Sequence, residues 1–156
     1  VFEDGTLLGT RGEVPDDPDF TVPFGVANIL RDGTDVTVVS IAGSVPHAIA
    51  AAEEMAKEGV SVEVIDPRTL VPLDKVTILN SVAKTGRLVV ADPAAKVCSA
   101  ASEIMSIVGE EAFWDLQAPM QKVASKQVHI PFAQSLEKLV YPTRDGIMEA
   151  IKKTLG

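Results

Sequence analysis

The sequence has little cysteine, few aromatic residues and an excess of acidic over basic residues, and each shortage excludes a class of function. Cys98 is the only cysteine among 156 residues, so no internal disulfide can form and the chain needs no oxidising compartment. Aromatic residues make up 4% of the chain, too few to suggest platforms for stacking nucleic-acid bases. The net charge of -8 argues against nucleic acid or an anionic membrane as a partner, whereas a basic protein partner is compatible with it.

Long apolar runs are missing as well. No stretch approaches the roughly 18 consecutive apolar residues of a membrane-spanning helix, and residues 1–5 lack the basic start of a signal peptide. With 46% hydrophobic and 23% charged residues, the composition is typical of a soluble globular protein. A chain of 156 residues suits one domain with a single core. Because the sequence begins with Val1 and not with Met, we expect a fragment or a processed product.

The usual catalytic motifs are also absent from the sequence. It contains no G-x-G-x-x-G, no G-K-[ST] and no G-x-S-x-G. His47 and His129 are the only histidines, so a zinc site with several nitrogen and sulfur ligands is not expected. Cys98 falls at the start of a predicted helix, where we expect a small buried hydrophobe and not a nucleophile. The sequence therefore predicts no catalytic, cofactor-binding or metal-binding residue, and a complete small enzyme using Cys98 or His47 is a remote alternative.

The sequence divides into an arm and one domain. Residues 1–25 show no sustained period and carry three prolines and a cluster of acids, which predicts an extended linker or arm. Residues 26–156 alternate between strand and helix patterns with short connections, which predicts an α/β domain with a mostly parallel sheet covered on both faces. Asp74 is expected to cap one helix and Gly86 to end it. The predicted strands cover residues 26–31, 36–42, 61–65, 87–91 and 120–124, and the predicted helices residues 45–58, 75–85, 99–112 and 144 onward.

Three strand ends are candidate sites, because ligands of α/β sheets bind beyond the carboxyl ends of the strands. The first is the turn around Gly43 and Ser44, whose free N–H groups are suited to an anion. There Gly43 is expected to allow the turn and Ser44 to cap the next helix, and this structural role is the stronger interpretation.

The second candidate is the loop of residues 66–70, which contains Asp66, Arg68 and Thr69. An acid, a guanidinium and a hydroxyl within four residues are suited to positioning a substrate carboxylate. They are equally suited to fixing the loop or contacting a neighbouring subunit, and we favour that interpretation. The third candidate is Asp92-Pro93, where Asp92 is expected to cap a turn.

Several short segments occur in a characteristic order along nearly the whole chain. They are residues 12–15 (GEVP), 22–25 (VPFG), 31–37 (RDGTDVT), 63–70 (EVIDPRTL), 72–74 (PLD), 84–90 (KTGRLVV), 118–119 (AP), 131–132 (PF) and 136–137 (LE). This ordered set resembles the E1 beta subunits of thiamine-diphosphate-dependent 2-oxo-acid dehydrogenase complexes. Asp66–Thr69 and Cys98–Ala100 resemble the acetoin dehydrogenase branch most, with pyruvate dehydrogenase beta also close.

The resemblance implies a transketolase C-terminal-like domain, a three-layer α/β/α fold whose five-stranded mixed sheet is parallel except for its first strand. It also implies that thiamine diphosphate and magnesium are held outside this domain, by the alpha subunit and the N-terminal domain of beta. The implied partners are the E1 alpha subunit, a second beta subunit and the lipoyl acyltransferase E2, to which the acidic domain would offer a docking surface. The implied location is the bacterial cytoplasm or the mitochondrial matrix.

One segment departs from the family pattern. The strand that ends near Ala91 is commonly followed in the family by Asp or His and then Glu-Ala, whereas this chain has Asp92-Pro93-Ala94. The resemblance therefore does not extend to the contact that this glutamate makes in the family. The leading hypothesis is a subunit-assembly domain that is inactive alone, and the alternative is a small-molecule or anion-binding regulatory module at Gly43 and Ser44.

Overall fold

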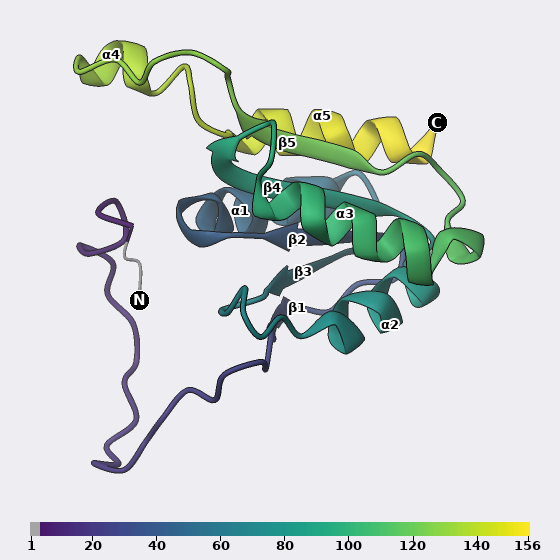
Figure 1. Ribbon diagram of the computed structural model, residues 1–156, viewed down its shortest axis with the longest axis horizontal. Coiled ribbons are helices and arrows are strands. Elements are labelled where there is room, and N and C mark those ends of the chain that lie inside the picture. The colour runs from purple at the N-terminus through teal and green to yellow at the C-terminus, as the bar shows by residue number, and fades with distance from the viewer. Residues whose placement is uncertain (1–3) are drawn as a thin grey trace.

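Five strands form one mixed sheet in the order β1-β3-β2-β4-β5 (Figure 1). The computed structural model describes residues 4–156. β2, β3, β4 and β5 are parallel neighbours, whereas β1 pairs with β3 in the antiparallel direction, which confirms the mixed sheet implied by the resemblance. The strands are β1 (Asn28–Arg31), β2 (Val36–Ser40), β3 (Val62–Asp66), β4 (Leu88–Ala95) and β5 (Gln121–Ser125).

Helices cover both faces of the sheet and give the three predicted layers (Figure 1). Alternate side chains of the central strands point to opposite faces, so the sheet has two separate cores. Val38 and Val64 lie in the core beneath α1 and α5, and Val39 and Ile65 in the core beneath α2 and α3. The helices are α1 (Val45–Lys57), α2 (Lys75–Thr85), α3 (Ala100–Glu111) and α5 (Arg144–Leu155), with a short α4 (Gln134–Glu137) and 3-10 turns η1 (Ala42–Ser44) and η2 (Phe113–Asp115).

The helix ends confirm most of the capping signals in the sequence. Asp74 accepts a hydrogen bond from the N–H of Thr77 at 3.1 Å, and Gly86 ends α2 with a φ of 69°. The prediction for Ser44 was wrong: its side chain forms no cap and donates to the carbonyl of Ile41 at 2.6 Å. The tight turn there is made by Ala42, whose φ is 47°, and not by glycine freedom at Gly43.

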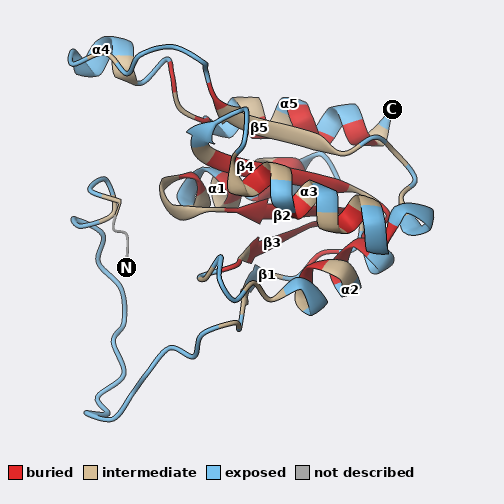
Figure 2. Ribbon diagram, in the orientation of Figure 1, coloured by how far each residue is buried: buried red, intermediate tan, exposed pale blue. Residues whose placement is uncertain are grey.

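Residues 4–27 form no strand or helix and are mostly exposed (Figures 1 and 2). A second exposed segment, residues 126–142, leaves the end of β5, carries α4 and returns to α5 (Figure 2). The part of the chain that the structure describes contains no helix both long and apolar enough to cross a membrane. The two exposed segments and the nearby ends of β2 and β4 shape the candidate site.

Candidate functional site

A cavity of about 680 Å³ lies at the carboxyl edge of the sheet, where ligands of α/β folds usually bind. Its walls come from the exposed arm, from the turn between β2 and α1, from the end of β4 and from the connection that leads into α5. The lining residues are Asp4, Gly5, Thr6, Ala42, Gly43, Ser44, His47, Pro93, Ala94, Glu137, Tyr141 and Pro142.

The turn at Gly43 holds a carboxylate that belongs to the chain itself. The N–H of Gly43 donates to Oδ2 of Asp4 at 2.9 Å, and Oδ1 of Asp4 accepts from the N–H and the hydroxyl of Thr6 at 2.9 and 2.6 Å. These contacts, the Thr6 hydroxyl first and its N–H next, hold the pKa of Asp4 below its usual value. A Cβ on Gly43 would lie 2.3 Å from Oδ2 of Asp4, so the close approach depends on glycine.

Ser44 contributes to this site less directly than Gly43. Its hydroxyl is buried and lies within 3.0 Å of the Ala91 carbonyl and 2.9 Å of the Ser40 hydroxyl, facing the sheet. Of the predicted anion site, only the Gly43 N–H and the cavity beside it therefore remain as candidates. Binding of an external anion there stays a prediction.

The loop of Asp66, Arg68 and Thr69 lies outside this cavity, so the structure does not bring the two candidate sites together. Asp66 accepts from the N–H of Arg68 at 2.9 Å, while Thr69 donates to the Pro72 carbonyl at 2.7 Å and accepts from the N–H of Gly25 at 2.9 Å. Arg68 has a φ of 57° and an exposed side chain. These hydrogen bonds fix the loop locally, and its role in an interface or with a ligand stays a prediction.

Asp92 caps a turn, as expected, and also the start of α3. Its oxygens accept from the N–H of Ala94 at 2.8 Å and from the N–H of Ala101 at 3.0 Å, so Asp92 replaces Ser99, which makes no side-chain cap. The prediction that Cys98 is buried was wrong, because the loop before α3 leaves the sheet surface and Ala101 takes the buried position. His47 lies in the cavity wall and His129 does not.

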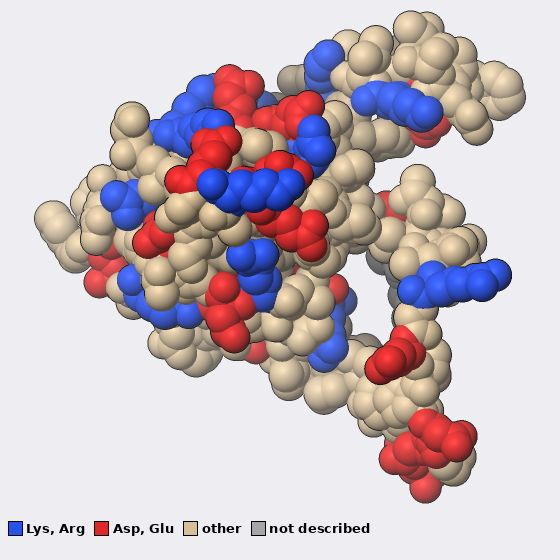
Figure 3. All heavy atoms as spheres, turned by 180° about the vertical axis from the view of Figure 1, so that it is seen from behind, with Lys and Arg blue, Asp and Glu red and all other residues tan. Residues whose placement is uncertain are grey.

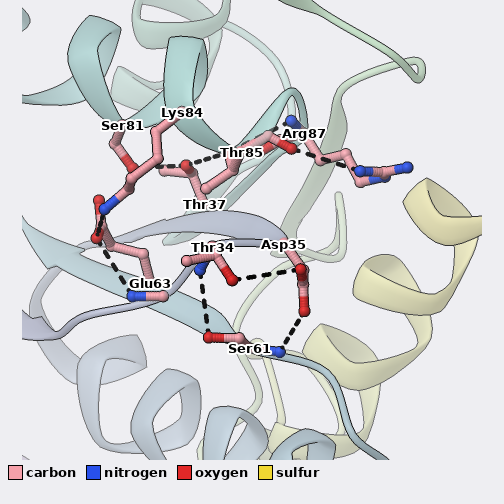
Figure 4. A network of polar contacts seen from close by, with 10 residues as sticks. Thr34, Asp35, Thr37, Ser61, Glu63, Ser81, Lys84, Thr85 and Arg87 are labelled. Carbon is pink, nitrogen blue, oxygen red and sulfur yellow. Dashed lines mark hydrogen bonds and ion pairs between the residues drawn. The ribbon is translucent and has the colours of Figure 1, made fainter.

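A buried polar network, which was not predicted from the sequence, lies at the edge of the sheet formed by the amino ends of the strands (Figure 4). The Glu63 side chain is buried in β3, pairs with Lys84 of α2 and accepts from the N–H of Gly33 at 3.3 Å. Thr37 of β2 lies 2.6 Å from the Ser81 hydroxyl. The sequence signal for this network is Glu63 within the run Ser-Val-Glu-Val-Ile. A carboxylate in a buried strand needs hydrogen-bonding or charged partners nearby.

The pKa of Glu63 is set by opposing effects. Burial alone would raise it, but hydrogen bonds from Lys84, Ser81 and the N–H of Gly33 outweigh burial and hold the pKa below its usual value. Glu63 is therefore ionised near neutral pH and ties β3 to α2. Its place at the amino ends of the strands makes it a structural element and not part of the cavity.

The five-stranded sheet with its antiparallel first strand matches the transketolase C-terminal-like α/β fold. The chain belongs to the family "Transketolase, C-terminal domain", whose model matches residues 25–147. A split-gene transketolase described as an inactive beta4 tetramer has a similar structure, with a TM-score of 0.76 and 27% identity, covering 93% of this chain and 47% of that chain.

Curated relatives confirm the resemblance to E1 beta subunits. The beta subunit of acetoin:2,6-dichlorophenolindophenol oxidoreductase from Cupriavidus necator is 43% identical over 98% of this chain and 45% of its own length. The pyruvate dehydrogenase E1 component subunit beta from Leifsonia xyli is 44% identical over 99% of this chain and 45% of its own length. The chain thus spans about half the length of the curated relatives it matches.

The cavity does not fit thiamine diphosphate, the cofactor that the resemblance implies for the whole enzyme. Its lining contains the carboxylates of Asp4 and Glu137 and no Lys or Arg, whereas a diphosphate needs cationic or metal partners. Within residues 4–156, no three His, Cys, Asp or Glu side chains gather closely enough to hold a metal ion.

Proposed function

We propose that the chain is the subunit-assembly domain of the beta subunit of a thiamine-diphosphate-dependent E1 dehydrogenase and that it is inactive by itself. The parent enzyme would decarboxylate a 2-oxo acid such as pyruvate, or cleave acetoin, and transfer the acyl unit to lipoamide. The names of the relatives support this reaction class, and thiamine diphosphate and magnesium would be bound by the alpha subunit and the rest of beta. The enzyme would work in a bacterial cytoplasm or a mitochondrial matrix.

The observation that carries the proposal is the apolar projection, which we define as residues 126–142. Its two ends are tied together by the hydrogen bond from the N–H of Lys126 to the carbonyl of Val140 at 3.0 Å, and the segment between them stands away from the sheet (Figure 1). Phe132 of this segment is fully exposed. Several exposed large apolar side chains gathered in one projecting segment are typical of a protein interface. The other exposed large apolar residues of the projection are Val128, Ile130, Leu136 and Leu139.

The proposed partners for this surface are the alpha subunit and a second beta subunit. The net charge of -8 also suits docking to a basic region of the lipoyl acyltransferase. Figure 3 shows acidic and basic side chains interspersed over one face of the body, with acids concentrated at the tip of the arm. Charge is therefore a secondary support, and the apolar projection is the principal one.

Light scattering of the purified chain, alone and mixed with the alpha subunit and the cofactor, tests the proposal. We expect a dimer or a complex with alpha, no turnover, and at least tenfold weaker association for Phe132→Ser. Trp114→Ser is the matched control, because Trp114 is 93% exposed but precedes β5, whereas the projection follows it. A chain that stays monomeric with and without alpha, or that turns over substrate with alpha, would sink the proposal.

A second candidate function is a small-molecule or anion-binding regulatory module at Gly43 and Ser44. The observation that supports it is the hydrogen bond from the Gly43 N–H to the Asp4 carboxylate, an anionic group of the chain itself. Calorimetric titration with inorganic phosphate, nucleotides and 2-oxo acids separates the two functions. Saturable binding that Gly43→Ala abolishes would favour the module.

A further inference from the structure

The arm of residues 4–24 is attached to the body at two places only, as far as the described hydrogen bonds extend. At one end the Asp4 carboxylate accepts from the Gly43 N–H. At the other, the arm joins the body at Gly25, whose N–H donates to Thr69 at 2.9 Å, and at Ala27, whose N–H donates to Asp74 at 2.9 Å. Between these attachments the arm arches away, and Figure 3 shows an opening between it and the body.

We propose that residues 4–10 are a releasable strap, in which Asp4 is a latch that closes one wall of the cavity and the chain near Gly25 is the pivot. With the latch formed, Asp4, Gly5 and Thr6 lie in the cavity wall. With it released, this wall is removed and the Gly43 turn faces solvent. This proposal does not rest on the assembly function, since the latch and the apolar projection use different residues.

The geometry of the latch is specific on both sides. Thr6 donates twice to Oδ1 of Asp4, which leaves Oδ2 directed at the body. Gly43 provides the only type of residue that admits this approach, because a Cβ would lie 2.3 Å from that oxygen and 3.1 Å from the Thr6 hydroxyl. The carboxylate also lies at the amino-terminal side of η1 and α1, where the helix dipole favours negative charge.

The pivot is firmer than the latch. Gly25 has a φ of 72°, a conformation that glycine adopts without strain, and its anchor Thr69 also donates to the Pro72 carbonyl. The Ala27 N–H bonds to Asp74, which itself caps α2. Within residues 4–156, two connected anchors hold the chain near Gly25, whereas one hydrogen bond to the body holds Asp4, so we expect Asp4 to detach first.

The experiment uses the single cysteine of the chain as a probe. Cys98 is exposed and follows Ala94, a residue of the cavity wall, by four positions, so it lies at most about 14 Å from that wall. A nitroxide attached to Cys98 is expected to broaden the amide NMR signals of Gly5, Thr6 and Leu7 in the wild-type chain. Asp4→Ala should restore these signal intensities at least twofold and shift the Gly43 amide resonance.

Gly43→Ala tests the same latch from the other side and should give the same recovery, because its Cβ displaces the carboxylate. Asp16→Asn is the matched control, since it removes one negative charge from the exposed arm without touching Gly43, and it should leave the broadening unchanged. Unaltered signals of β2 and β4 show that each variant is folded. The proposal is overturned if the wild-type signals are not broadened, or if Asp4→Ala leaves them as broad as before.

Discussion

Glu63 and Lys84 form an ion pair in which the carboxylate side chain is 1% exposed and the ammonium side chain 44% exposed. Loss of the ion pair therefore has a different consequence for each of the two side chains. Lys84 can turn to solvent, whereas Glu63 has only its neighbours in the sheet to replace water. The pair belongs to the network that joins β3 to α2 at the amino edge of the sheet.

Glu63→Gln is expected to lower the free energy of unfolding by about 1.5–3 kcal/mol, the range for hydrogen bonds that involve a charged group. Urea denaturation followed by circular dichroism measures the loss. Glu111→Gln is the control, because the Lys75–Glu111 pair is exposed on both sides and should lose less than about 1 kcal/mol. Equal losses in the two variants would contradict the role assigned to burial.

The contribution of Glu63 should depend on pH in one direction. Hydrogen bonds hold its folded-state pKa below the ordinary value of 4.5, so the ionised form is favoured in the folded chain. This stability is fully present above the unfolded-state pKa and is lost as pH falls through the folded-state pKa. The difference in urea midpoint between wild type and Glu63→Gln should therefore shrink below about pH 4. A difference that is constant from pH 7 to pH 3 would rule this out.

Gly59 and Gly86 both have a positive φ, 81° and 69°, which alanine adopts only with strain. Gly59 has open space where a Cβ would be, and at Gly86 a Cβ would meet the exposed side chain of Gln117, which can turn into solvent. Gly59→Ala and Gly86→Ala should therefore each cost about 1–2 kcal/mol from backbone strain. Thermal unfolding of both variants measures the cost, and no loss in either variant would contradict the strain argument.

Cys98 should behave as a surface thiol. Because its side chain is exposed, we expect it to react completely with a thiol reagent in the folded chain, without denaturant. Cys98→Ser should change stability by no more than about 0.5 kcal/mol, as is usual for surface positions. A Cys98 thiol that reacts only after unfolding would contradict the exposed position and support the buried position predicted from the sequence.

The sequence predicted best where local signals are strong. The β-branched runs of β2 and β3, and the pair Asp74 and Gly86 around α2, carry their structure in adjacent residues. The antiparallel direction of β1 has no such signal in four residues, and the family resemblance supplied it. α4 was not predicted, because four residues cannot show a helical period.

The candidate site was predicted only in part, because its contacts are not local. Gly43 was identified as a turn able to hold an anion, but the anion comes from Asp4, 39 positions earlier in the chain. The roles of Ser44 and Cys98 were predicted from their positions at helix starts. In the structure the Ser44 side chain points inward to the Ile41 carbonyl, whereas the Cys98 side chain is exposed. The direction of a side chain in a short connection depends on such tertiary contacts, and these cannot be predicted from the periodicity of the sequence.

The packing of α5 beside α1 determines when this helical layer can form during synthesis on the ribosome. Ala48, Ala52 and Met55 of α1 share their core with Ile147 and Ile151, so an early helix is covered by a very late one. Translation must therefore proceed through almost the whole domain before that layer closes. Until then the apolar face of α1 lacks its cover, so we expect cooperative folding of the domain only after the segment that follows Thr143 has left the exit tunnel.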